Sequence, residues 1–178
     1  AARGAFIAIL ESDDFMYPNA LELLHNAAVS HDAQVVKGNF SFYWTQGNRD
    51  ELHRMVEGGM CGRIVDTRED MHIFFQKPSI WSGLYRRDFL EHNAIRFLET
   101  PAASYQDTSF SFKIWAAASR AVFLEEPLVH YRQDNEASSV NSKGKVFCVC
   151  DEYAEINRWL DGRARNGHSD ALRHMAQI

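Results

Sequence analysis

Apolar and polar residues follow two periods along the chain, one typical of buried strands and one typical of amphipathic helices. Apolar residues run without a break from Ala5 to Leu10. This run predicts a strand that is buried on both faces inside a parallel sheet, with neighbours on both sides. After Pro18, apolar side chains such as Leu21 recur at helical spacing, which predicts a helix that ends near His31.

The rest of the chain continues this alternation. Further strands are expected at residues 34–36, 40–44, 61–65, 79–87, 121–124 and 128–131. Further helical segments are expected at residues 68–76, with Thr67 as N-cap, at 88–92, from 107 onward, and from about 145 to 161. The last of these carries a narrow apolar seam, which favours a helix docked on its own domain over a coiled coil. The seam consists of Val146, Val149, Tyr153, Ile156 and Leu160. The alternation predicts an α/β protein.

Three carboxylates follow directly after the first strand, at Glu11, Asp13 and Asp14. Ligand groups in open α/β sheets gather just past the carboxyl ends of strands. Acids this close repel one another unless a cation lies between them, and oxygen ligands suit Mg²⁺ or Mn²⁺. A solvated turn is the alternative, in which Asp13 or Asp14 caps the helix that Pro18 begins. Both interpretations stand on this stretch alone.

Composition narrows the class of protein. The 178 residues carry a net charge of −5 with a pI of about 5.9, which does not favour a nucleic-acid-binding protein. Apolar runs all fall short of the roughly 20 residues that a membrane span needs. The three cysteines, Cys61, Cys148 and Cys150, include no C-x-x-C pair, which favours reduced thiols that serve as packing residues in a cytosolic protein.

Three separate stretches share the order and spacing of one protein family. The first, residues 4–21, places Glu-Ser-Asp-Asp between a strand and a Pro-led helix. The second, residues 81–110, includes Trp-Ser-Gly-Leu-Tyr-Arg-Arg-Asp, Phe-Leu-Glu-Thr-Pro and Tyr-Gln-Asp-Thr-Ser-Phe. The third, residues 127–139, holds Pro-Leu-Val-His-Tyr-Arg and a pair of serines. The chain therefore resembles the C-terminal part of a family 2 glycosyltransferase catalytic domain, of the bacterial type that builds surface polysaccharides and lipopolysaccharide.

The resemblance implies a partial GT-A fold, the fold of nucleotide-diphospho-sugar transferases, with a mixed sheet flanked by helices and a C-terminal helix. Residues 1–142 would form the metal- and acceptor-binding part, and residues 143–178 a C-terminal helical extension. The strands that hold the nucleotide in this family precede the acidic motif and have no counterpart here. The chain also begins with Ala and has no signal peptide, so we expect it to be part of a longer protein.

The resemblance also assigns roles at the acidic motif. Asp13, with Glu11 beside it, would hold Mg²⁺ or Mn²⁺, and Glu11, Asp14 and Arg132 would contact the nucleotide-sugar donor. Glu11 stands where the family usually has Asp, and its carboxylate is one methylene longer. A lysine of the loop after Arg132, either Lys143 or Lys145, would close over the diphosphate. The alternative is that Arg132 is a solvated basic residue beside a surface linker.

Asp107 would be the general base by the same resemblance, and the alternative is a helix N-cap. It follows Gln106, where the family commonly has Glu, so a second carboxylate that would raise the pKa of the base is missing. Trp81 and Tyr105 would form part of an acceptor platform, although a strand Trp is more often a core residue. His130 is expected to pack in the sheet rather than to bind metal.

The implied function is inverting transfer of a sugar from a nucleotide-diphosphate donor to a saccharide or lipid-linked acceptor, in the cytoplasm or at the inner face of the membrane. A degenerate, non-catalytic module that binds sugars or scaffolds an assembly is the alternative. A nuclease or phosphatase would need a second cluster of acids or histidines, which the sequence does not show. Because the first strand lacks its upstream neighbours, the chain is expected to form a homodimer through the Ala5–Leu10 region and to be inactive alone.

Overall fold

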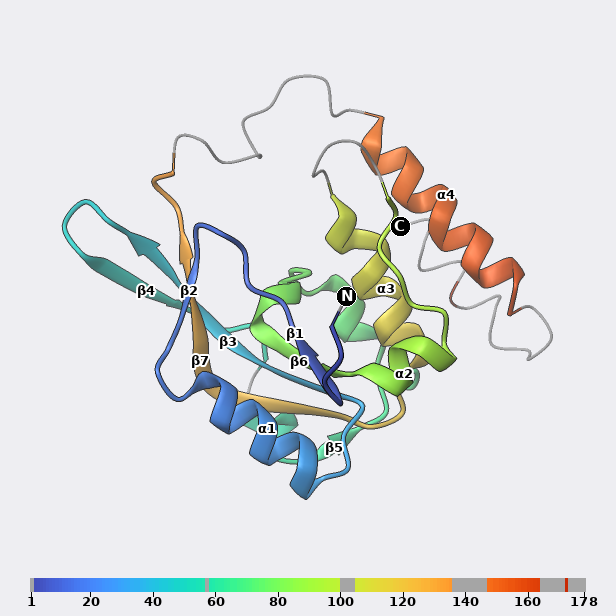
Figure 1. The fold of residues 1–178 in the computed structure, drawn as a ribbon, viewed down its shortest axis with the longest axis horizontal. Helices are drawn as coiled ribbons and strands as arrows, with labels where there is room; N and C mark the ends of the chain where they lie inside the picture. Colours follow the sequence, from blue (N-terminus) through green and yellow to red (C-terminus); the bar gives the residue numbers. More distant parts are fainter. Residues whose placement is uncertain (1, 57, 100–104, 136–146, 164–171, 173–178) are drawn as a thin grey trace.

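The computed structural model describes residues 2–56, 58–99, 105–135, 147–163 and 172 (Figure 1). A mixed sheet runs through it in the order β1-β6-β3-β7-β2, with β4 paired to β3 and β5 paired to β7. The strands are β1 (Phe6–Ala8), β2 (Phe15–Met16), β3 (Val35–Trp44), β4 (Arg49–His53), β5 (Ile64–Val65), β6 (Gly83–Arg86) and β7 (Ala121–Arg132). Among these named pairs, β3 and β7 run parallel, and all the others are antiparallel.

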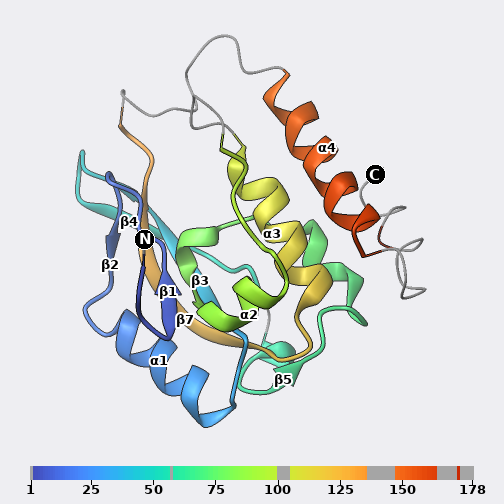
Figure 2. The ribbon, with the colours of Figure 1, turned by 45° about the vertical axis from the view of Figure 1, so that its right-hand side comes forward.

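Helices cover this sheet and pack on one another. The α-helices are α1 (Ala20–Ser30), α2 (Arg87–His92), α3 (Gln106–Ala117) and α4 (Cys148–Asp161). The short 3₁₀ helices are η1 (Gly58–Met60), η2 (Met71–Phe75) and η3 (Ile80–Ser82). α1 packs on β3, β6 and β7, and α4 runs alongside α3 as the outermost element (Figures 1 and 2). None of the helices among the described residues is long and apolar enough to cross a membrane.

The parallel pair β3 and β7 forms the centre of the molecule. The first seven residues of β3 are all buried, including the polar Lys37, Asn39 and Ser41. The register between the two strands shifts around Gly38, opposite the segment that contains Pro127, which lacks the N–H that a regular ladder requires. A Cβ at Gly38 would lie 2.6 Å from Leu128 Cδ1, so the close approach of the strands requires glycine here.

The structure corrects the prediction for the first strand. β1 has three residues rather than the full run of six, and it pairs antiparallel with β6 instead of lying in a parallel ladder. It lies at the end of the strand order, with β6 as its one neighbour among the described residues, as expected if its other neighbour precedes this chain. Phe6 and Ile7 are half-buried, and Leu10 is 51% exposed. The apolar run therefore overstated the length of the strand, because the chain leaves the sheet at Ile9 to enter the acidic loop.

The helix predicted at 68–76 is also wrong, because only η2 forms there and Asp70 caps it by accepting a hydrogen bond from the His72 N–H. Thr67 is fully buried, and its hydroxyl lies 2.7 Å from the carbonyl oxygen of Trp115 and 2.8 Å from that of Ala118. This hydroxyl therefore satisfies carbonyl groups at the end of α3 instead of capping its own segment.

Several strand boundaries also differ from the predictions. The two segments predicted at 34–44 form one strand, because β3 buries its polar interruption without a break. The two predicted at 121–131 also form one strand, because β7 accommodates residues 125–127 by register shifts against β3. The segment at 79–87 divides into η3 and β6. β4 was not predicted, because four of its five side chains are exposed and show no alternation.

The predicted buried faces of the helices are confirmed in part. Leu24 and Ala28 of α1 are buried as expected, whereas Leu21 is 53% exposed. In α4, Ile156 and Leu160 of the predicted seam are buried, whereas Tyr153 is exposed and Val146 lies outside the described residues. All three cysteines are free, as predicted. The packing role is wrong for Cys150, because its side chain is exposed.

Candidate functional site

The loop between β1 and β2 brings three carboxylates together. Asp14 N donates a hydrogen bond to the Glu11 carbonyl oxygen at 3.3 Å, which closes a tight turn. One oxygen from each of Glu11, Asp13 and Asp14 lies within 4.8 Å of the other two. Three oxygens this close are suited to a hard divalent cation. Neither Asp13 nor Asp14 caps α1, since the N-cap is Asn19, so the alternative of a simple capping turn is wrong.

Asp14 is the buried member of this cluster, with 8% of its surface exposed. Its Oδ1 accepts a hydrogen bond from Arg132 N at 2.9 Å, and its Oδ2 has no hydrogen-bond partner among the described residues. Burial raises the pKa of Asp14 to about 6, while the N–H group and charge of Arg132 oppose this rise. A buried carboxylate oxygen without a partner is costly, and a bound cation would satisfy it. The residues present therefore fit a divalent metal.

Glu11 and Asp13 complete the cluster from more accessible positions. Burial raises the pKa of Glu11, and the charges of Asp14, Asp13 and Asp107 add to this effect. Asp13 Oδ2 accepts a hydrogen bond from Asn135 Nδ2 at 2.9 Å, so the residues after β7 help to hold it. The negative charge of Asp107 contributes least to this rise in the pKa of Glu11.

Arg132, the last residue of β7, braces the acidic loop. Its Nε donates a hydrogen bond to the Asp13 carbonyl oxygen at 2.8 Å, and its Nη1 donates to Thr45 Oγ1. The guanidinium also lies 5.2 Å from the centre of the Tyr43 ring. Arg132 is therefore part of the cluster rather than a solvated residue beside a linker. Lys143 and Lys145, the residues expected to close over the diphosphate, lie outside the described residues. The serine pair of the third family-like stretch, Ser138 and Ser139, lies outside them as well.

Asp107 occupies the first turn of α3, behind an N-cap residue, Tyr105, whose φ of 56° is left-handed. The N-cap alternative for Asp107 is therefore wrong. Burial raises the pKa of Asp107, the backbone N–H groups of Asp107 and Thr108 lower it, and Glu152 raises it further. A raised pKa suits a group that must take up a proton near neutral pH.

The two aromatic residues of the predicted acceptor platform differ in exposure. Trp81 is only 4% exposed, and its ring stacks on Tyr131 with centroids 4.9 Å apart. Tyr105 is 52% exposed. Burial raises the pKa of Tyr131, and the charges of Glu11, Asp14 and Asp13 raise it further. Sequence reasoning missed Tyr131, although it stands in the third family-like stretch directly before Arg132.

His130 packs within the sheet, which confirms its expected role. Its ring stacks against Phe15 at 4.3 Å and Tyr17 at 3.9 Å between centroids. Its Nδ1 lies 2.7 Å from Asp50 Oδ1, so β4 also holds it. These contacts leave His130 as a structural residue of the sheet.

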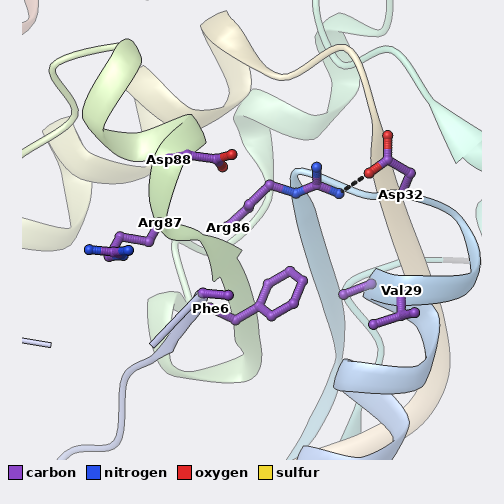
Figure 3. A pocket seen from close by; sticks show the side chains of 8 residues that line it. Phe6, Val29, Asp32, Arg86, Arg87 and Asp88 are labelled. Carbon is purple, nitrogen blue, oxygen red and sulfur yellow. Dashed lines mark hydrogen bonds and ion pairs between the residues drawn. The ribbon is translucent and has the colours of Figure 1, made fainter. Parts of the chain in front are cut away.

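Two cavities lie outside the acidic cluster. One, of about 410 Å³, lies at the start of β1 and is bordered by Phe6, Val29, Arg86 and Arg87 (Figure 3). Arg86 there pairs with Asp32 at 2.5 Å. None of the three clustered carboxylates lines this cavity. The other, of about 290 Å³, lies between η2, α3 and α4 and includes Thr108, the neighbour of Asp107.

Comparison with known proteins reveals relatives among named glycosyltransferases. The chain is 26% identical over 177 residues to YibD of Escherichia coli K12, named an uncharacterized glycosyltransferase, covering 93% of this chain and 49% of YibD. It is 26% identical over 138 residues to EpsH of Bacillus subtilis 168, named a putative glycosyltransferase, covering 74% of this chain and 38% of EpsH. The chain thus spans about half or less of the curated relatives it matches. No family model matches it.

Solved structures of S. aureus TarS share the fold. TarS 1–349 in complex with UDP-GlcNAc superimposes with a TM-score of 0.68 at 19% identity, covering 89% of this chain and 43% of TarS 1–349. The complex with UDP gives a TM-score of 0.60 at 20% identity, covering 96% of this chain and 45% of the other. The expected fold, a partial GT-A fold with a mixed sheet and flanking helices, is confirmed. The predicted resemblance to glycosyltransferases is confirmed as well.

Proposed function

We propose that this chain is the metal- and acceptor-binding part of a family 2 glycosyltransferase. The reaction is inverting transfer of a sugar from a nucleotide-diphosphate donor to a hydroxyl of a saccharide or lipid-linked acceptor, in cell-surface polysaccharide synthesis. The names of the curated relatives support a transferase, and UDP-GlcNAc in TarS supports a UDP-sugar donor. We place the reaction in the cytoplasm, including the inner face of the membrane.

The observation that carries this proposal is the cluster of three carboxylates in the loop after β1. Glu11, Asp13 and Asp14 offer oxygens within 4.8 Å of one another, and Asp14 Oδ2 has no partner among the described residues. These residues would hold Mg²⁺ or Mn²⁺. When bound, such an ion supplies positive charge that stabilises a departing diphosphate.

Side chains of this chain take the other roles in the reaction, which are proton transfer, donor binding and acceptor binding. Asp107 accepts the proton of the acceptor hydroxyl as that oxygen attacks the anomeric carbon, and its raised pKa suits this role. Arg132 holds the acidic loop in place through the Asp13 carbonyl oxygen and adds positive charge beside the donor diphosphate. Tyr105, exposed at the start of α3, contacts the acceptor. Trp81, which stacks on Tyr131, is the second residue of this proposed acceptor platform.

A non-catalytic sugar-binding or scaffolding module is the second candidate. The substitution of Glu11 for the usual Asp favours it, whereas the joint presence of Asp13 and Asp107 opposes it. A nuclease or phosphatase is disfavoured, because the described residues hold only one cluster of potential metal ligands. A catalytic domain would turn over the donor, whereas a binding module would bind the donor without turnover.

The test of the proposed function is release of UDP by the full-length protein. It is incubated with UDP-GlcNAc and other UDP-sugars, with Mn²⁺ or with a chelator, and free UDP is measured. We expect metal-dependent release that rises when an extract containing acceptor is added. Metal-dependent binding of UDP-sugars without any release would favour the non-catalytic module instead.

We also propose that the 178-residue chain by itself forms a homodimer through the Ala5–Leu10 region and neither binds nucleotide tightly nor transfers sugar. β1 has one strand neighbour among the described residues, which leaves its other edge open. Light scattering should give twice the monomer mass, and Leu10→Lys should restore the monomer. Leu21→Lys is the matched control, because Leu21 on α1 is as exposed (53%) as Leu10 (51%). A monomer at high concentration would contradict the dimer, and UDP release by the isolated chain would contradict its inactivity.

A further inference from the structure

A buried carboxylate from the C-terminal helix lies against the first turn of α3. Glu152 of α4 is 1% exposed, and its Oε2 accepts a hydrogen bond from Ser109 N at 3.1 Å. Its Oε1 has no hydrogen-bond partner among the described residues, and neither has the buried Ser109 Oγ. Ser109 follows Asp107 by two residues, so the Glu152 charge lies beside the candidate base. A buried acid with so few partners is costly for stability alone.

A buried lysine, Lys37, contacts α3 from the sheet, through the ring of Trp115. Lys37 of β3 is 1% exposed, and its Nζ donates a hydrogen bond to the Ser79 carbonyl oxygen at 2.7 Å. The ammonium also lies 5.7 Å from the centre of the Trp115 ring. Lys37 forms no ion pair within 4.0 Å among the described residues. Burial lowers the pKa of Lys37 to about 7, and the charge of Asp107 partly restores it.

The contrast with a second buried lysine shows what is unusual here. Lys113 of α3 is also fully buried, but its Nζ pairs with Glu155 Oε1 at 2.7 Å and donates to the Arg96 carbonyl oxygen at 3.1 Å. That pair ties α4 to α3 with both charges matched. Glu152 and Lys37, by contrast, form no ion pair within 4.0 Å among the described residues.

We propose that Glu152 is a positioning residue through which α4 brings a buried anion against the first turn of α3, next to Asp107, and that Lys37 is the buried cation that opposes this anion. The proposal rests on the proposed role of Asp107. Glu152 thereby supplies a second carboxylate near the base, in place of the Glu that the family commonly has at the position of Gln106. The other charged or titratable groups that act on or respond to Asp107 are Glu11 of the acidic loop, Lys77 before η3 and Tyr131 of β7.

The two charges act on Asp107 in opposite directions. The Glu152 carboxylate raises the pKa of Asp107, and the Lys37 ammonium lowers it. Lys37 is charged below about pH 7, which is the range in which a carboxyl group titrates. Glu152→Gln should therefore lower the pKa of Asp107, and Lys37→Met should raise it. Each shift should be about 1 unit, the size expected for a nearby charge.

The experiment follows the side-chain carboxyl of Asp107 by carbon NMR titration in the full-length protein. Its signal is assigned by its loss in Asp107→Asn. Glu155→Gln is the matched control on the same helix, because it breaks the pair with Lys113 and should lower Tm without moving the Asp107 titration. The acidic limb of the pH profile of UDP release should move with the NMR value in both variants.

The outcomes separate this inference from the proposed function. Opposite shifts in Glu152→Gln and Lys37→Met, with none in Glu155→Gln, support the charge arrangement. Unchanged titration of Asp107 in either folded variant overturns it, even if Asp107→Asn is inactive. If Glu152→Gln fails to fold, the Lys37 variants decide alone: Lys37→Met, or Lys37→Gln, whose amide can still donate to the Ser79 carbonyl oxygen. Full UDP release by Asp107→Asn overturns the proposed base, whatever the titration shows.

Discussion

Asp107→Asn is expected to reduce sugar transfer by the full-length protein by about 10²- to 10⁴-fold, the contribution of a general base. The substitution removes the proton acceptor but keeps the size and shape of the side chain. Transfer is measured as UDP release from the donor, together with binding of the donor by calorimetry. We expect binding to stay within a few-fold of the native value, because Asp107 is not one of the three clustered carboxylates.

The stability of this variant provides the control. Because burial raises the pKa of Asp107 in the folded protein, the folded state binds its proton more tightly than the unfolded state does. This carboxyl group therefore contributes less to stability as the pH rises from its unfolded pKa through its raised folded pKa. A neutral Asn avoids that loss, so Tm at pH 7 should be equal or higher. Near-normal turnover in a stable Asp107→Asn protein would mean that the base lies elsewhere.

Part of the fold could be predicted from the sequence, because local pattern and family resemblance agreed there. α1, α3 and α4 occur where apolar spacing placed them, and Asp107 does lie on the first turn of a helix. The β1 prediction failed in strand length and pairing direction, because continuous apolar residues show neither where a strand ends nor whether its partner runs parallel. β4 was missed because exposed side chains carry no alternation, so only its pairing with β3 makes it a strand.

The candidate site, like the fold, could be predicted from the sequence only in part. The acidic motif identified Glu11, Asp13 and Asp14, because these residues are close in sequence and a short loop keeps them close in space. The charges around Asp107 come from residues 37 and 152, far apart in the sequence. Burial of Lys37 and Glu152 arises from packing of β3 and α4, and nothing local to either residue indicates it. Tertiary contacts therefore decide which polar residues act on the candidate base.

Asp13→Asn is expected to weaken Mn²⁺-dependent binding of a UDP-sugar to the full-length protein by roughly 100-fold or more. Removing one charged partner from a clustered ion site costs about 3 kcal/mol or more, which corresponds to about this factor. The loop itself should persist in the variant. Asn135 can still donate to the remaining side-chain oxygen at residue 13, and Arg132 Nε bonds the backbone oxygen, which the substitution leaves in place.

Glu11→Asp is the informative companion, because it keeps the charge and restores the residue usual in the family. It should retain metal-dependent binding in the same calorimetric titration with Mn²⁺ and UDP-GlcNAc. Asp32→Asn controls for loss of a surface carboxylate away from the cluster, since Asp32 pairs with Arg86 beside the cavity at the start of β1. Undiminished Mn²⁺-dependent binding by Asp13→Asn would exclude Asp13 as a metal ligand. Loss of binding in Asp13→Asn would establish that the carboxylate at residue 13 is required. Retained binding in Glu11→Asp would establish that the side chain at residue 11 can be one methylene shorter.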